Sequence, residues 1–242
     1  LFIMCKLRGQ FRADISRHDW GLILLRTGAE VAGTYFFLTA LLNMPIANVT
    51  AIMQVLPLSV ALAAAVFLRE PLGWRRVTAI IVGFGGVLLI IQPGGFGFSS
   101  FSLYALVTVA CVTLRDIAVR RMTGQAPPVF VALIAAIGVA GLGCVGSAFV
   151  TLKPISGLAG LQLAGATVCL IFGYIFSVMT MRVGDIGFVA PFRYTSLLVA
   201  LVLGVVLFDE WPNTLTLIGA GVVVATGLFT LYRETKQRRH AA

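Results

Sequence analysis

Long apolar runs separated by short polar segments dominate the chain from about residue 20 onward. Apolar residues within a run are continuous rather than alternating, which favours helices over the strands of a membrane barrel. Runs of about 20 apolar residues are long enough to cross a bilayer as a helix. The pattern predicts eight spans, at residues 22–42, 46–68, 77–91, 101–114, 129–150, 158–179, 186–208 and 215–231. We therefore expect an all-α, polytopic transmembrane helix bundle.

Composition supports this prediction and excludes a soluble domain. Hydrophobic residues make up 59% of the chain and charged residues only 11%, whereas soluble domains carry about 25% charged residues. A net charge of +9 is also found in proteins that bind nucleic acids. Here the basic residues fall in short segments between the apolar runs, with no basic stripe interleaved with aromatics, so we expect no nucleic-acid partner.

The basic residues instead occupy alternate loops, as the positive-inside rule requires. Loops before the first span, after every second span and after the last span are basic, and the others lack Lys and Arg apart from Lys153. The basic loops contain Lys6, Arg8, Arg12, Arg17, Arg69, Arg75, Arg76, Arg115, Arg120, Arg121, Arg182, Arg233, Lys236, Arg238 and Arg239. We predict a multi-pass protein of the cell inner (plasma) membrane, with its C-terminus in the cytoplasm.

The chain also contains a weak internal repeat. Residues 45–91 form a long apolar segment, a tight acidic turn at Glu70 and a glycine-rich apolar segment, and residues 185–231 have the same order with a turn at Glu210. The two glutamates are 140 positions apart. Basic residues flank only the first turn, so the turns are expected on opposite sides of the membrane. Two copies of opposite orientation form an inverted repeat, with an odd number of helices in each.

The repeat predicts how the chain is divided. The second copy begins near residue 99, so a first copy of equal length would begin about 40 residues before Leu1. We expect a 5+5 arrangement in which the N-terminal helix and most of the second are missing from this chain. Its parts would be an incomplete first repeat at 1–92, a second at 99–233 and a basic cytoplasmic tail at 234–242. A natural eight-helix protein is the alternative.

Several short stretches resemble a known family. Residues 47–50 with Pro57, residues 68–72 and residues 83–87 resemble an EamA domain of the drug/metabolite transporter superfamily, and residues 189–227 resemble a diverged second one. The resemblance implies ten helices in two inverted halves around a central cavity. Members of this superfamily carry amino acids, nucleotide sugars, nucleoside-like compounds, S-adenosylmethionine and other metabolites. The resemblance is specific for the fold and weak for the substrate.

Ionisable side chains deep in a bilayer are costly and mark candidate functional sites. Glu30 lies about 15 Å beyond the interfacial Trp20 at the helical rise, near the midplane. Arg26 is one turn nearer the cytoplasm on the same face, and Tyr35 is close by in the sequence. In the seventh span, Arg193 lies a little over two turns from its cytoplasmic end.

These charges suggest a substrate with charges of both signs. Arg193, followed by Tyr194, would bind an anionic part such as a carboxylate. Glu30 would bind a cationic part, or take up and release a proton as the cavity changes sides. The alternative is a structural ion pair of Arg26 with Glu30, with Arg193 extending toward the cytoplasm.

Two prolines point to the same depth. Pro57 and Pro191 interrupt corresponding helices of the two copies, and such interruptions mark binding sites in transporters. Asn48 and Gln54 add polar groups on the first of these helices, and Tyr174 adds one on the second copy's counterpart of the Glu30 helix. For each of these polar residues taken singly, a hydrogen bond between helices is the favoured explanation.

The remaining motifs exclude other classes of protein. No HExxH, GxSxG, CxxC or Cys/His cluster occurs, and His18 and His240 lie outside the spans. We therefore expect no enzyme, no metal and no cofactor. We expect Arg115 and Asp116 to form a salt bridge in a loop near the cytoplasmic surface. Glycine-rich helices serve either internal packing or a homodimer seam.

The favoured function is a secondary transporter that moves an amino-acid-like or S-adenosylmethionine-like metabolite across the inner membrane by alternating access, with proton coupling through Glu30 as an option. An exporter of neutral or cationic drugs or metabolites is the first alternative. A non-transporting accessory membrane subunit is the second. A channel is less well supported, because the polar groups cluster near mid-depth rather than forming a continuous stripe.

Overall fold

The computed structural model describes residues 15–69, 73–92, 99–122, 127–149, 156–183, 195–209 and 211–241. This part of the chain consists of helices joined by short connections and contains no strand, which confirms the predicted all-α class. The helices are α2 (Arg17–Asn43), α3 (Ile46–Met53), α4 (Leu56–Leu68), α5 (Trp74–Ile91), α6 (Phe101–Arg121), α7 (Pro128–Ala148), α8 (Gly157–Val183), α10 (Thr195–Phe208) and α11 (Thr214–Ala241).

Most helix boundaries lie within five residues of the predicted ones, and two helices extend further at their C-terminal ends. α6 continues seven residues past the predicted end at residue 114, and α11 continues to Ala241 through most of the predicted tail. Hydropathy detects only the apolar part of a helix, whereas the backbone hydrogen bonds continue until a residue that breaks the helix.

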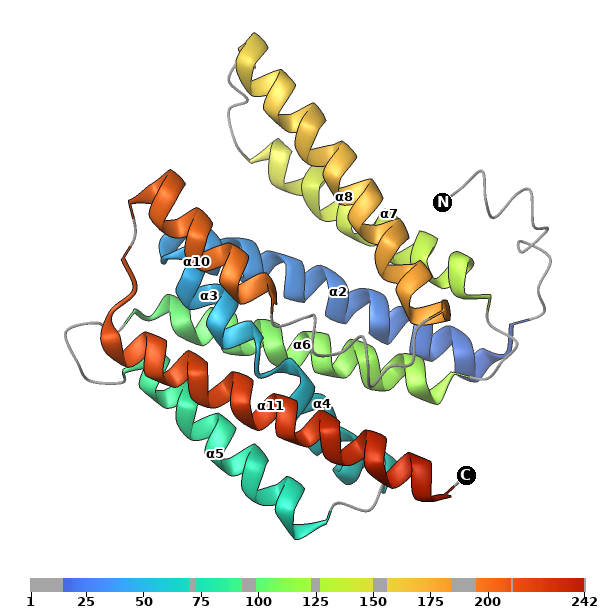
Figure 1. The fold of residues 1–242 in the computed structure, drawn as a ribbon. Coiled ribbons are helices and arrows are strands. Elements are labelled where there is room, and N and C mark those ends of the chain that lie inside the picture. Colours follow the sequence, from blue (N-terminus) through green and yellow to red (C-terminus); the bar gives the residue numbers. More distant parts are fainter. Residues whose placement is uncertain are drawn as a thin grey trace.

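The helices form a bundle in which α3 and α4 lie at the centre of the largest apolar core (Figure 1). Val49, Ile52 and Leu58 of these two helices are fully buried. α2 packs along α6 and α7, and α5 packs along α11. The contacts of Trp20 with Phe130 show that α2 and α7 begin at the same end of the bundle.

The α5–α11 contact depends on glycines, and we name Gly83, Gly86 and Gly219 the glycine seam. A Cβ placed on Gly86 would lie 2.9 Å from the carbonyl oxygen of Gly219, and one on Gly219 would lie 2.5 Å from the carbonyl oxygen of Gly86. A Cβ on Gly83 would lie 2.8 Å from the hydroxyl of Thr226. The missing side chains therefore allow the two backbones to approach each other directly, as is common between membrane helices.

The outer surface of the bundle is apolar. Large side chains such as Leu161, Val206 and Ile81 are about two thirds or more exposed. Within the described residues, three helical segments are long and apolar enough to cross a membrane: Ile46–Leu68, Phe101–Arg121 and Phe130–Ala148. Together with shorter apolar helices, this composition is that of a multi-pass membrane protein.

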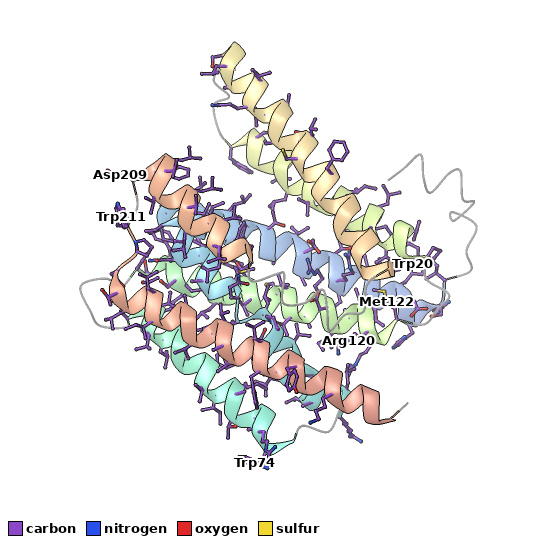
Figure 2. All side chains as sticks on the ribbon, in the orientation of Figure 1. Trp20, Trp74, Arg120, Met122, Asp209 and Trp211 are labelled. Atoms are coloured by element: carbon purple, nitrogen blue, oxygen red, sulfur yellow. The ribbon has the colours of Figure 1, made fainter. Side chains whose placement is uncertain are left out.

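Side chains suited to a membrane interface lie at the two ends of the bundle. Figure 2 shows Trp20, Arg120 and Met122 toward one end, and Asp209 and Trp211 toward the other. Trp211 is 76% exposed, as expected for an indole at headgroup level. The start of α2 and the end of α6 therefore lie at one end of the bundle, and the connection between α10 and α11 lies at the other (Figure 2).

Helix boundaries recur at the spacing of the predicted repeat. α2 and α8 both contain 27 residues, and their first residues are 140 positions apart. α4 and α10 end 140 positions apart, each followed by a residue with positive φ, Arg69 (55°) and Asp209 (54°). α5 and α11 also begin 140 positions apart. The two structural copies and their inverted orientation stay predictions.

Candidate functional site

Four charged side chains meet between α2 and α6, and we name Arg26, Glu30, Arg115 and Asp116 the ionic cluster. The Arg115 Nη1 donates to both carboxylate oxygens of Glu30, at 3.1 Å and 3.2 Å. The Arg115 Nε donates to Asp116 Oδ1 at 2.9 Å. The Arg26 Nη2 lies 3.8 Å from Glu30 Oε2. Glu30 is therefore bonded to a cation of another helix more closely than to the cation of its own.

Local structure positions this cluster. The helix α2 begins after Ser16, whose side chain accepts a hydrogen bond from the Asp19 backbone at 3.1 Å, a typical N-cap. Spacing of four residues then puts Arg26 and Glu30 on one face. One turn further, a Cβ on Gly33 would lie 3.3 Å from the Cβ of Cys111. A small residue at Gly33 therefore lets α2 approach α6 beside the charges.

The cluster is electrically balanced and only partly covered. Two arginines face two carboxylates, so its formal charges cancel. The side chains of Glu30 and Arg115 are 25% and 28% exposed. Charged side chains that face lipid without an ionic partner are strongly disfavoured. The exposed parts of Glu30 and Arg115 are therefore expected to face a polar cavity or another charged group.

One edge of the cluster carries unsatisfied polar atoms. The Arg26 Nη1 donates to the backbone carbonyl of Val131 on α7 at 3.4 Å. The Arg26 Nε and the Thr27 hydroxyl are buried and have no hydrogen-bond partner among the described residues. Buried polar atoms without a protein partner commonly bind water or a ligand.

The structure corrects the expectation for Arg115 and Asp116. They form the predicted salt bridge, but within α6 rather than in a loop, and Arg115 also pairs with Glu30. The prediction failed because the apolar run stops at residue 114. The available signal was the absence of Gly and Pro between residues 115 and 123, which lets the helix continue.

A second group of polar contacts surrounds a break in the central helix. α3 ends at Met53, α4 starts at Leu56, and Pro57 lies in the first turn of α4. At this break the Gln54 amide donates to the Ser196 hydroxyl near the start of α10 at 3.2 Å. Proline lacks an N–H group, and its ring clashes with the carbonyl of the residue four positions earlier, here Met53, which explains why α3 ends there.

A further polar contact lies between α4 and α6. The hydroxyls of Ser59 and Thr113 are 2.8 Å apart. Thr113 and Arg115 are two positions apart and so project from α6 in directions about 160° apart. Thr113 therefore faces α4, whereas Arg115 faces α2. The described contacts thus form two separate polar groups, the ionic cluster and the contacts of α3 and α4 with Ser196 and Thr113.

The structure does not bring the other predicted site residues to the ionic cluster. Tyr35 is 53% exposed, packs edge-on against Phe36 and projects about 140° away from Glu30 around α2. Asn48 is half-buried in α3. The side chain of Tyr174, and the residues Pro191, Arg193 and Tyr194, lie outside the described residues. The convergence of Glu30 and Arg193 on one cavity stays a prediction.

An apolar groove of ≈ 680 Å³ lies between α4, α5 and α6. Its lining includes Leu62, Ile81, Phe84 and Leu106, and no charged side chain. Because a charged metabolite needs polar partners, the groove is a less suitable site than the two polar groups.

The chain shares sequence with known membrane transporters. Residues 1–92 match the model of the EamA-like transporter family. The chain is 28% identical over 193 residues to the S-adenosylmethionine uptake transporter of Rickettsia bellii (strain RML369-C), which covers 79% of this chain and 66% of that protein. It is 24% identical over 229 residues to the riboflavin transporter of Vibrio cholerae serotype O1, covering 94% of this chain and 77% of that protein.

A third relative is an exporter. The chain is 27% identical over 240 residues to the pseudopaline exporter of Pseudomonas aeruginosa (strain UCBPP-PA14), covering 95% of this chain and 81% of that protein. The chain thus spans about two thirds of the length of the S-adenosylmethionine uptake transporters. It spans a larger share of the riboflavin transporter and of the pseudopaline exporter. These relatives are transporters rather than enzymes. Residues 1–92 are thus similar to the EamA-like transporter family, and most of the chain is similar to proteins named as transporters of small metabolites.

Proposed function

We propose that this protein is a secondary transporter that moves a small charged metabolite across the bacterial inner membrane. The observation that carries the proposal is the ionic cluster, which places four charged side chains between helices of an otherwise apolar bundle. Such groups are retained in membrane helices mainly where a polar ligand, an ion or a proton is handled. The names of the relatives support the same class of function.

A substrate with charges of both signs fits the charged residues best. Glu30 would bind a cationic group, and Arg193 an anionic group such as a carboxylate. Amino-acid-like compounds and S-adenosylmethionine carry both, and four relatives that are 24–28% identical are S-adenosylmethionine uptake transporters. Glu30 would also serve as the proton site if transport is proton-coupled.

The break in the central helix supports alternating access. The break after α3 meets the start of α10, and these segments belong to the two copies proposed at 1–92 and 99–233. Transporters commonly bind substrate where interrupted helices of two repeats meet. In this proposal the repeats are inverted, the C-terminal segment lies in the cytoplasm, and the exposed apolar helices α7 and α8 are candidates for a homodimer contact.

Uptake into proteoliposomes tests the proposal. The full chain is reconstituted, and uptake of labelled S-adenosylmethionine, methionine and lysine is measured with and without a pH gradient. We expect saturable uptake of at least one compound, lost in Glu30→Gln and in Arg193→Ala. Arg75→Ala is the matched control, because Arg75 is an exposed arginine at the bundle surface beside Trp74.

The outcomes separate the alternatives. Uptake that requires Glu30 and Arg193 but not Arg75 supports a carrier of doubly charged metabolites. Uptake of lysine alone, unaffected by Arg193→Ala, points to the cationic-compound exporter, assayed in the reverse direction. No saturable flux in either direction contradicts the transporter proposal and favours an accessory subunit.

A further inference from the structure

Arg115 has a specific relation to Glu30 that the sequence did not reveal. Its guanidinium lies between two carboxylates, with Nε on Asp116 at 2.9 Å and Nη1 on Glu30 at 3.1 Å. A single nitrogen, Nη1, thus donates to both Glu30 oxygens, unlike the two parallel bonds from two nitrogens that make arginine–carboxylate pairs strong. The bond from Arg115 to Asp116 is the shorter half of this bridge.

The geometry makes the Glu30 bond replaceable. If another cation took Arg115's place at Glu30, Arg115 would keep its bond to Asp116 and would not become an unpaired charge. Arg26 could not take that place without moving, because its Nη2 is 3.8 Å from the carboxylate and its Nη1 is bonded to the carbonyl of Val131. An unpaired buried charge is the main penalty when a salt bridge opens, and this arrangement avoids it.

We propose that Arg115 is an internal counter-ion that the cationic group of the substrate displaces from Glu30. Arg115 neutralises Glu30 when no substrate is bound, and its competition sets the affinity and selectivity for cationic groups. Only a cationic group with N–H donors of its own competes with the guanidinium nitrogen for the carboxylate, so ammonium groups are selected over neutral ones. This inference rests on the proposed function and adds a specificity-determining residue to it.

A double-mutant cycle tests this proposal. KM and kcat for labelled S-adenosylmethionine uptake are measured for the parent, Arg115→Gln, Glu30→Gln and the double variant in proteoliposomes. We expect KM to fall about ten-fold in Arg115→Gln, which corresponds to about 1.4 kcal/mol. Glu30→Gln and the double variant should both lose saturable uptake. Arg120→Gln, which removes an exposed arginine from the same helix, should keep the parent's KM.

A structural ion pair gives the opposite pattern. Removing both partners of such a pair would restore transport, so parent-like uptake by the double variant overturns the proposal. An unchanged or higher KM in folded Arg115→Gln also overturns it. If Arg115→Gln does not fold, the double variant decides the question, because it contains no unpaired member of the pair. A parent that takes up no S-adenosylmethionine contradicts this inference, whereas flux of another compound leaves the transporter proposal standing.

Discussion

The glycine seam and the ionic cluster hold the same bundle together by opposite means. At the seam between α5 and α11, backbone atoms meet because side chains are missing. At the cluster between α2 and α6, long charged side chains fill the space between the helices. Close backbone packing allows one arrangement, whereas a guanidinium nitrogen can donate to more than one oxygen. The difference suggests a fixed contact on one side of the bundle and an adjustable one on the other.

The largest effect is expected from adding one carbon to the seam. A Cβ in Gly219→Ala would lie 2.5 Å from a backbone oxygen, so the helices must separate. We expect a loss of about 2–3 kcal/mol in the free energy of unfolding, as for other overpacked sites. Thermal unfolding in detergent measures this loss. Gly221→Ala on the same helix is the control, because there is open space around Gly221. Equal melting temperatures of the two variants would contradict the claim that the glycine seam is a fixed contact.

A smaller effect is expected from removing the carboxylate that holds Arg115. Asp116→Asn keeps the shape but weakens a charged hydrogen bond at a partly exposed site, so we expect a loss of about 1 kcal/mol. In the proposed exchange, Arg115 would also rely more on Glu30, so KM for a cationic substrate should rise. Asp209→Asn is the control, since Asn tolerates its left-handed backbone equally well. An Asp116→Asn variant with lower KM would contradict the shared-arginine arrangement.

The hydrogen bond between Ser59 and Thr113 allows the coupling energy of a neutral pair to be compared with that of an ionic pair. A double-mutant cycle with Ser59→Ala and Thr113→Val should give a coupling energy of about 0.6 kcal/mol, the average for hydrogen bonds between membrane helices. Unfolding of the four proteins in bicelles measures it. A coupling larger than that of Glu30 with Arg115 would mean that the ionic cluster contributes little to packing.

The smallest net effect is expected from Gln92→Gly at the outer end of the seam, where two opposing contributions nearly cancel. Gln92 has a positive φ of 51°, and its amide donates to Asn213 at 3.0 Å. Gln92→Gly loses the bond but relieves the backbone, so stability should change by only a few tenths of a kcal/mol, whereas Gln92→Ala should cost about 1 kcal/mol. Chemical denaturation of both variants provides the comparison, and an alanine variant as stable as the glycine variant would remove the backbone argument.

The sequence predicted much of the fold because lipid leaves few choices. Continuous apolar runs predicted the helices, and Pro57 marked the interruption of the central one. The site was harder to predict, because periodicity along one helix finds only neighbours such as Arg26 and Glu30. The closer partner of Glu30 is Arg115, which is 85 positions away. Arg115 lies on the polar end of α6, which the hydropathy pattern predicts to be a loop. Which helices face each other is set by small residues such as Gly33, and no single-helix pattern reveals that pairing.

The zero formal charge of the ionic cluster has an electrical consequence. Moving one elementary charge through 100 mV involves about 2.3 kcal/mol of work. Two positive and two negative side chains that move together through the field do no net work, so the membrane voltage neither drives nor resists their motion. A current recorded from the reconstituted protein would then contain no contribution from a joint displacement of the four cluster charges.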